Sequence, residues 1–231
     1  MPIKMQSKRP REVTRSPSAT KKKLREDVRA FRRELILKTA TDIFFDSGYE
    51  RTSVNDIAGA MSVSKAVVYY NFKSKEGILN AIIERTMALT GAAIGHGISA
   101  GRSPPEQLAL IGFLYASHVL KNNKMFGVYF REERSVMPAM RRRISAFERD
   151  LYVKVAGVLD AGIATGAFLR SDTRLLSFTI MSMIAMAYHW YREDEPVSQD
   201  GLARHYAEKA LRLAGYTGRA ELEAASFVST P

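Results

Sequence analysis

The sequence predicts an all-α protein with a small N-terminal bundle and a larger helical domain behind it. Apolar residues recur at spacings of three to five from Arg29 onward, and no stretch alternates convincingly between apolar and polar residues. The first pattern is typical of an amphipathic helix, whereas a half-buried strand needs a period of two. Helix start and stop signals also divide the chain, with Ser before an apolar run and Gly after it.

The first two helices follow from such signals. The first is expected over residues 29–47, and Gly48 can then take the left-handed conformation that ends a helix. The second is expected to begin at Ser53, whose hydroxyl can accept a hydrogen bond from the amide of Asp56. It continues to about Ala60.

A tight turn and a third helix come next. Residues 61–63 form the expected turn, and Ser64 caps a helix that ends near Phe72. Ser74 caps a fourth helix with a buried isoleucine and leucine face. Two short helices separated by a tight turn are the pattern of a helix-turn-helix, which presses its second helix into the DNA major groove.

The larger domain begins after a stretch rich in glycine. Glycines 91, 95, 97 and 101 are expected to break the helical pattern and mark the domain boundary. Ser103, two prolines and Glu106 then restart a helix with a cap and a capping-box glutamate. Further helices are expected at about 125–136, from 138 to beyond 159, over 175–191, and over 198–214, where Gly215 ends the last one.

The expected organisation has four parts. Residues 1–28 form a disordered basic arm, 29–80 the helix-turn-helix domain, 81–217 a ligand-binding and dimerisation domain, and 218–231 a loose C-terminal tail. Residues 1–33 hold twelve basic and three acidic residues, so they carry +9 of the net charge of +11. Such an arm can contact DNA phosphates and release counterions; the alternative is a solubilising tail.

Composition excludes several classes of protein. The absence of cysteine rules out disulfides, thiol catalysis and cysteine zinc sites. The basic N-terminus lacks the apolar core of a secretory signal. The longest apolar run, residues 178–188, is shorter than the ~20 residues of a membrane span. We therefore expect a cytoplasmic protein with no membrane partner.

The third helix carries the predicted DNA contacts. Val68 and Phe72 are spaced to face the bundle core, which leaves an apolar and aromatic face pointing outward. Alanine and valine can contact thymine methyls, lysine can reach guanine or a phosphate, and hydroxyls hold phosphates. The alternative is an ordinary small bundle with an aromatic edge. The predicted DNA-binding residues are Thr52, Ser53, Ser64, Lys65, Ala66, Val67, Tyr69, Tyr70, Asn71 and Lys75.

Residues 34–80 resemble the N-terminal domain of the tetracycline-repressor (TetR) family. The resemblance lies in Thr-Ser-Val at 52–54, Val-Ser-Lys at 63–65, and Tyr-Tyr-Asn-Phe-Lys-Ser-Lys at 69–75. It implies a ligand-responsive regulator, usually a repressor, that binds double-stranded operator DNA. Three positions depart from the family pattern. Ser62 replaces a turn glycine and must adopt a strained conformation, Ala66-Val67 replaces Gly-Thr, and Asn71 replaces histidine.

Two helices are expected to form a homodimer. A single reading helix contacts few base pairs, so a two-fold dimer on a near-palindrome would double the readout. Apolar residues over 178–187 surround one helix on every side, which is more than one core face can use. We expect this helix and the helix over 198–214 to pair with their copies. The alternative is a helix buried within one monomer.

Aromatic residues and arginines predict a ligand pocket. Their density suggests an apolar cavity with a cationic mouth, suited to a small effector with an anionic group; the alternative is that they are core. The predicted ligand-binding residues are Phe113, Phe126, Tyr129, Phe130, Arg134, Phe147 and Trp190. The segments 130–134 and 188–192, followed by Pro196, resemble TetR relatives that control degradation pathways, which implies an acyl-coenzyme A effector.

Two other classes of function fit the sequence less well. The four histidines do not stand at metal-ligand spacing, and no nucleophile motif or phosphate-binding glycine loop is present. We therefore expect no enzyme, no metal and no cofactor. A DNA-coating protein without an effector would not need so large an apolar-rich C-terminal part.

Overall fold

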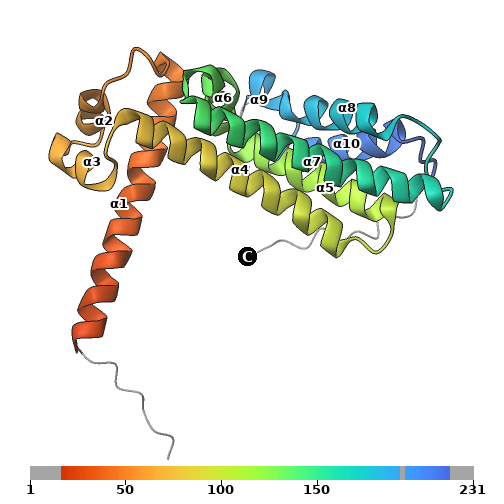
Figure 1. Cartoon of the computed structure of the whole chain (residues 1–231), viewed down its shortest axis with the longest axis horizontal. Helices are drawn as coiled ribbons and strands as arrows, with labels where there is room; N and C mark the ends of the chain where they lie inside the picture. Colours follow the sequence, from red (N-terminus) through yellow and green to blue (C-terminus); the bar gives the residue numbers. More distant parts are fainter. Residues whose placement is uncertain (1–16, 193–195, 219–231) are drawn as a thin grey trace, which may run out of the picture.

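The computed structural model describes residues 17–192 and 196–218, and within these ranges every regular element is a helix. The all-α prediction is therefore confirmed. In Figure 1, α1 (Pro17–Ser47), α2 (Val54–Ala60) and α3 (Lys65–Asn71) form one end of the molecule. The helix α4 (Lys75–Ala100) runs from this end into a bundle.

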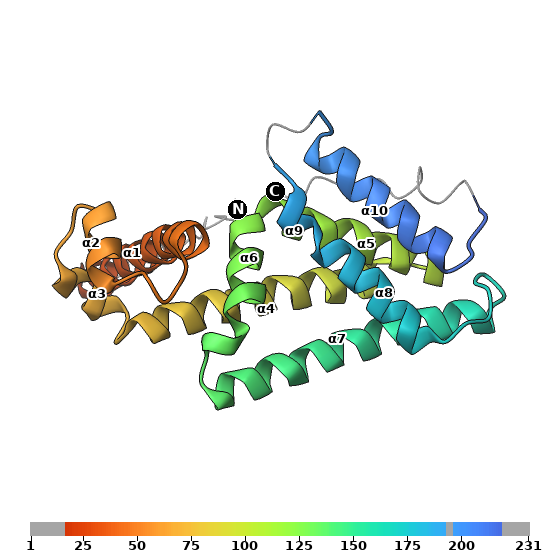
Figure 2. The same cartoon turned by 90° about the horizontal axis from the view of Figure 1, so that it is seen from above.

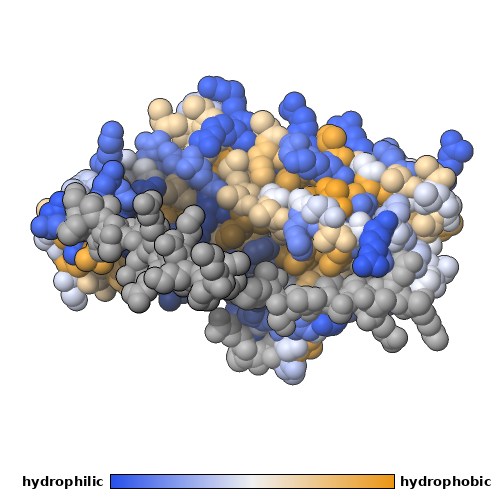
Figure 3. Space-filling view, turned by 90° about the horizontal axis from the view of Figure 1, so that it is seen from below, coloured by the Kyte–Doolittle hydropathy of each residue, from blue (hydrophilic) through white to orange (hydrophobic). Residues whose placement is uncertain are grey.

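The bundle contains the remaining helices. These are α5 (Pro104–Lys121), α6 (Asn123–Glu132), the short 3-10 helix η1 (Glu133–Ser135), α7 (Pro138–Ala164), α8 (Thr173–Ala185), α9 (Ala187–Trp190) and α10 (Gln199–Leu213). We call the end formed by α1, α2 and α3 the predicted DNA-reading end. Seen from above, α6 crosses α4 between this end and the rest of the bundle (Figure 2). Seen from below, hydrophilic side chains project along the edges and apolar ones gather over the bundle (Figure 3).

Serine caps set the helix starts as predicted at several places. The hydroxyl of Ser53 accepts from the Asp56 amide and the Asp56 carboxylate accepts from the Ser53 amide, which completes a capping box. Ser74 and Ser103 also accept from amides three residues later. Ser64 occupies the cap position of α3, but its side chain makes no capping hydrogen bond.

The helix α1 begins earlier than expected. It starts at Pro17 rather than Arg29, so the predicted disordered arm is corrected for residues 17–28; residues 1–16 lie outside the described part of the chain. Half of residues 17–28 are Lys, Leu, Arg or Ala, and all four are good helix formers. High charge indicated disorder, but the charged residues here are compatible with continuous helix.

The predicted break is wrong at three of the four glycines, and only Gly101 ends a helix, as the C-cap of α4. The helix α4 passes through Gly91, Gly95 and Gly97 without interruption and joins the two ends of the molecule. A Cβ on Gly97 would lie 2.7 Å from the backbone nitrogen of Ile111, so glycine lets α5 approach α4 closely. Gly112 does the same for α10, since its Cβ would lie 2.9 Å from the Cα of Ala207. Gly97 and Gly112 therefore mark close contacts between helices.

Two cores hold the molecule together. One contains Ile36, Phe44, Ile57 and Val68 of the N-terminal bundle and continues to Met125 and Val128 of α6 and Met140 and Ile144 of α7. The other packs α5, α7, α8 and α10 around the end of α4. Because the first core includes α6, the DNA-reading end is fixed to the bundle by buried contacts as well as by α4.

Candidate DNA-binding surface and ligand pocket

The turn between α2 and α3 contains the strained serine that the sequence predicted. Ser62 has φ = 54°, in the left-handed region that favours glycine. The turn is closed by two backbone hydrogen bonds, from the Ser62 amide to the Gly59 carbonyl and from the Val63 amide to the Ala58 carbonyl, each 3.0 Å long. This turn sets the direction of α3.

The helix α3 has the two faces that its spacing predicted. Val68 and Phe72 are buried at 0% and 4% exposure, whereas Tyr69 and Tyr70 are 50% and 71% exposed. Lys65 and Ala66 are also exposed, and Val67 is half-buried. Exposed tyrosines and a valine beside a lysine form a surface suited to base edges, methyl groups and phosphates. We call these five residues, Lys65, Ala66, Val67, Tyr69 and Tyr70, the reading face.

Two predicted DNA contacts are corrected because their side chains are buried. Thr52 is 4% exposed, and its hydroxyl donates to the Gly48 carbonyl at 2.8 Å. Asn71 is 8% exposed, and its amide nitrogen donates to the Val67 carbonyl at 2.9 Å. Both residues close local turns, so neither side chain is presented to a duplex.

Lys75 is engaged within the protein. Its ammonium donates to the Tyr49 carbonyl at 2.9 Å and lies 4.2 Å from the centre of the Tyr49 ring. It therefore ties the start of α4 to the loop after α1. Ser53 and Ser64 are exposed at the starts of α2 and α3, and the Ser53 hydroxyl also donates to Asp56 at 2.8 Å.

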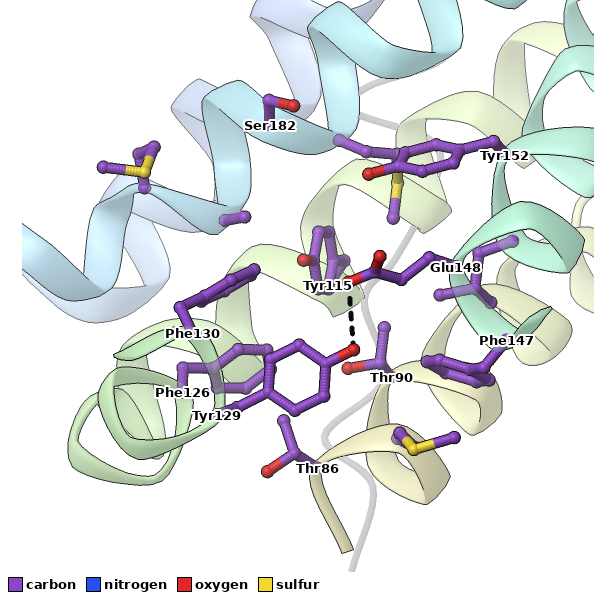
Figure 4. A pocket seen from close by; sticks show the side chains of 15 residues that line it. Thr86, Thr90, Tyr115, Phe126, Tyr129, Phe130, Phe147, Glu148, Tyr152 and Ser182 are labelled. Carbon is purple, nitrogen blue, oxygen red and sulfur yellow. Dashed lines mark hydrogen bonds between the residues drawn. The ribbon is translucent and has the colours of Figure 1, made fainter. Parts of the chain in front are cut away.

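A cavity of about 120 Å³ lies in the bundle behind the reading end. Helices α4, α5, α6, α7 and α8 supply its walls, and Figure 4 shows aromatic rings and hydroxyls pointing into it. Four predicted ligand-binding residues are brought together here: Phe126, Tyr129, Phe130 and Phe147. The walls also include Met87, Leu151, Met181 and Met186. The predicted apolar and aromatic cavity is therefore present.

Three predicted ligand-binding residues lie elsewhere. Phe113 packs against Arg204, whose guanidinium carbon lies 5.6 Å from the centre of the Phe113 ring. Arg134 is exposed in η1, and its carbonyl accepts from Arg141. Trp190 is 46% exposed on α9. None of them lines the cavity.

The predicted cationic mouth is also corrected. The cavity walls contain no arginine or lysine among the described residues. Arg131 donates to the Phe45 carbonyl at 2.6 Å, Arg143 pairs with Glu84 at 2.6 Å, and Arg192 donates to the His189 carbonyl. These side chains hold helices and loops together. The prediction that they surround the opening of the cavity was therefore wrong.

Glu148 is the polar residue that the sequence did not reveal. Its carboxylate accepts from the Tyr129 hydroxyl at 3.0 Å, with Tyr115 and Tyr152 close by (Figure 4). Burial raises the pKa of Glu148, while the hydrogen bond from Tyr129 opposes that rise. The only available signal was its position next to Phe147 on the inward stripe of α7.

The helix α6 connects this cavity to the DNA-reading end. Phe126, Tyr129 and Phe130 line the cavity, whereas Arg131 lies 4.5 Å from the centre of the Phe45 ring of α1. Near the start of α6, Lys124 forms ion pairs with Asp42 and Asp46 of α1 at 3.1 and 3.2 Å. A movement of α6 in response to a ligand would therefore move α1 directly.

Two family models match the chain. "Bacterial regulatory proteins, tetR family" covers residues 36–82, and "Tetracyclin repressor-like, C-terminal domain" covers residues 101–214. The repressor KstR2 of Rhodococcus jostii is 27% identical over 187 residues, covering 78% of this chain and 89% of its own. Together the matches and the geometry define a helix-turn-helix DNA-binding regulator with a separate cavity-bearing domain.

Solved structures extend this similarity. PfmR, a TetR family transcriptional regulator from Thermus thermophilus, is 30% identical, with a TM-score of 0.71 over 77% of this chain and 97% of its own. The chain belongs to the TetR family of bacterial regulatory proteins. AibR, solved with isovaleryl coenzyme A and operator DNA, is 22% identical, with a TM-score of 0.70 over 80% of this chain and 100% of its own, and shares the fold.

Two features are absent from the part of the chain that the structure describes. None of the helices in 17–192 and 196–218 is both long and apolar enough to span a bilayer. The same residues contain no group of three or more His, Asp or Glu side chains arranged to hold a metal ion.

Proposed function

We propose that this protein is a transcriptional repressor that binds a palindromic operator as a homodimer and releases it when a small effector fills the cavity. The observation that carries the proposal is the reading face, which presents two exposed tyrosines and an exposed lysine on a short helix that follows a strained turn. Relatives such as KstR2 are repressors, which supports repression as the direction of control. Such a regulator acts on DNA in the bacterial cytoplasm.

The dimer is proposed to form mainly through α8. Its outward positions Leu175 and Phe178 are 62% and 36% exposed, and they lie three residues apart on one side of the helix. The outward positions of α10 are more polar than the sequence analysis expected, with Arg204 and Arg212 in ion pairs to Asp200 and Glu208. The proposed interface therefore has an apolar centre on α8 and a charged rim on α10.

The effector is proposed to place an apolar body in the cavity. An acyl-coenzyme A thioester remains the candidate that the family resemblance implies, and AibR was solved with one. Because the described cavity walls contain no basic side chain, its acyl part would enter and its phosphates would stay outside. A DNA-coating protein without an effector is disfavoured, because such a protein has no use for a cavity lined by aromatic side chains.

The effect of an effector is proposed to travel through α6. A ligand that displaces Phe126 or Phe130 would shift α6 against α1 and change the separation of the two reading helices. That separation must match one DNA turn, roughly 34 Å, for both helices to bind. A coupling free energy of about 1–3 kcal/mol is ordinary for such a change.

The proposal is tested with operator fragments selected from the source genome. Lys65→Ala combined with Tyr69→Ala should weaken operator binding more than about 100-fold, because a good base contact contributes about 1–3 kcal/mol and a dimer loses each contact twice. The thermal midpoint should stay unchanged, since both side chains are exposed. Fluorescence anisotropy with the selected duplex measures the affinity, and Lys154→Ala on α7 serves as a control.

Three results would count against the proposed function. These are the recovery of no specific fragment, wild-type affinity of the Lys65→Ala/Tyr69→Ala protein, and sedimentation as a monomer at micromolar concentration. Thermal shifts with a panel of acyl-coenzyme A thioesters and free acids identify the effector class, since a ligand stabilises the folded state that binds it.

A further inference from the structure

The first half of α1 projects beyond the N-terminal bundle (Figure 1). Every residue from Lys21 to Leu35 is exposed, and Ile36 is the first buried position after them. A helix rises 1.5 Å per residue, so these residues extend for roughly 20 Å. An exposed helix of this length is a second surface that neither the reading face nor the cavity uses.

One face of this projection is cationic. Lys22, Arg25, Arg29 and Arg33 are spaced by three, four and four residues, so they lie on one side of the helix. We call these four residues the cationic face. Glu26 shares this side, which leaves three net positive charges. Two apolar stripe residues, Leu24 and Phe31, lie about 200° away from Lys22 and Arg29 and are 63% and 70% exposed.

The cationic face adjoins the reading face. The Arg33 guanidinium donates to the Asn71 carbonyl at 3.1 Å and lies 4.0 Å from the centre of the Phe72 ring, so it fixes α1 against the end of α3. One helical turn earlier, the Arg29 guanidinium lies 5.6 Å from the centre of the exposed Tyr70 ring. The two surfaces are continuous through Tyr70 and Arg29.

We propose that the cationic face is a second DNA-binding element, which contacts phosphates outside the segment read by α3. This inference rests on the proposed operator binding and adds Lys22, Arg25 and Arg29 to it. Lys22 and Arg29 are seven residues apart, about 10 Å along the helix, which is about the rise of three base pairs. The helix holds these charges at fixed positions relative to the reading face, whereas a disordered arm would hold them at no fixed position.

The occupant is duplex DNA because charge and position both require it. Three net positive charges beside a DNA-reading helix complement a polyanion. Contacts of this kind carry no sequence information and set affinity and register. The element therefore lengthens the footprint of the protein without lengthening the recognised sequence.

The test uses two duplexes of one selected operator. The short duplex ends at the outer edges of the two recognised half-sites, and the long one extends ten base pairs beyond each edge. The wild-type protein should bind the long duplex at least tenfold more tightly. Lys22→Gln with Arg29→Gln should remove that preference and flatten the log–log salt dependence by about two units per protomer, since each phosphate contact contributes about 0.9.

A matched control separates this contact from general charge. Lys23→Gln with Lys38→Gln removes the same charge from other sides of α1 and should keep most of the preference for the long duplex. Ala30→Pro keeps every charge but interrupts the helix above the core, so it should remove the preference as well. Circular dichroism checks that each variant retains its remaining helices.

Two results would overturn the inference. One is equal affinity of the wild-type protein for the short and long duplexes. The other is an equal loss in the Lys22→Gln/Arg29→Gln protein and its charge-matched control, which would reduce the effect to net charge. In either case wild-type binding of the short duplex would still support the proposed operator recognition, so the two failures can be told apart.

Discussion

The reading face and the cavity are assembled in opposite ways. The reading face comes from the seven consecutive residues of α3, and its orientation depends on the adjacent turn and caps. The cavity takes its walls from five helices between Thr86 and Met186. The first surface therefore follows from local rules, whereas the second exists only because helices distant in sequence pack together. The helix α6 contacts both, which makes their connection open to experiment.

The connection between the two regions can be broken at Gly127. A Cβ at this position would lie 2.4 Å from the Phe45 ring, so Gly127→Ala must displace that ring or move α6 away from α1. Overpacking of this kind costs about 1–3 kcal/mol, and we expect the thermal midpoint to fall by several degrees. Operator affinity should fall as well. Calorimetry and anisotropy measure the two effects.

A second glycine provides the control for that substitution. Gly157 lies in the exposed middle of α7, with no atom within 4 Å of its added Cβ. Gly157→Ala should therefore stabilise the protein by about 0.5–1 kcal/mol through helix propensity. If Gly127→Ala were equally stabilising, α6 and α1 would not be closely packed in solution.

The strain in the turn before α3 can be tested at Ser62. Ser62→Gly relieves the left-handed strain and should stabilise the protein by about 0.5–1 kcal/mol, after allowing for the greater freedom of glycine in the unfolded chain. Ser145→Gly, in the interior of α7, should instead lower the free energy of unfolding by about 0.5 kcal/mol. Thermal unfolding of both variants measures the difference, and destabilisation by Ser62→Gly would contradict the left-handed assignment.

The chemistry of the cavity can be examined through the pH dependence of Glu148. Because burial raises its pKa above the ordinary 4.5, the folded state holds this proton to higher pH than the unfolded state. The stabilising contribution of the protonated Glu148 is therefore fully present below pH 4.5 and is lost as the pH rises through its folded pKa. Glu148→Gln should remove that decline. It should raise the free energy of unfolding at pH 7 by less than about 1 kcal/mol, since the carboxylate is partly exposed.

Tyr129→Phe should act in the opposite direction to Glu148→Gln. It removes the hydrogen bond that opposes the rise in the pKa of Glu148, so the decline with pH should become steeper. Thermal midpoints between pH 4 and 8 distinguish the two variants. Identical pH profiles for both variants and the wild type would place Glu148 in open solvent.

The sequence predicted what local signals determine. The capping box at Ser53, the left-handed Ser62 and the buried positions of Val68 and Phe72 each depend on residues a few positions apart. The resemblance carried by residues 34–80 gave the family, and the family models agree. The predicted DNA contacts of Thr52 and Asn71 were wrong. Their hydroxyl and amide groups could bind phosphates, but each donates to a backbone carbonyl four residues earlier.

Long-range packing explains the remaining errors. The glycines of α4 signalled a break because their effect depends on whether another helix approaches, as α5 does at Gly97. The arginines suggested an anion site because composition does not say which carbonyl or carboxylate each one meets. Glu148 was missed because its partner Tyr129 lies nineteen residues away on another helix.

Operator affinity of a cavity-filling variant tests the link between pocket and DNA most directly, and it needs no knowledge of the effector. Thr90 is 4% exposed and lines the cavity, so Thr90→Phe places a ring where a ligand would bind, while Thr90→Val removes only the hydroxyl. If filling the cavity moves α6 and with it α1, Thr90→Phe should weaken operator binding about tenfold or more, and Thr90→Val should bind like the wild type. A folded, dimeric Thr90→Phe protein that binds the operator with wild-type affinity would contradict the account.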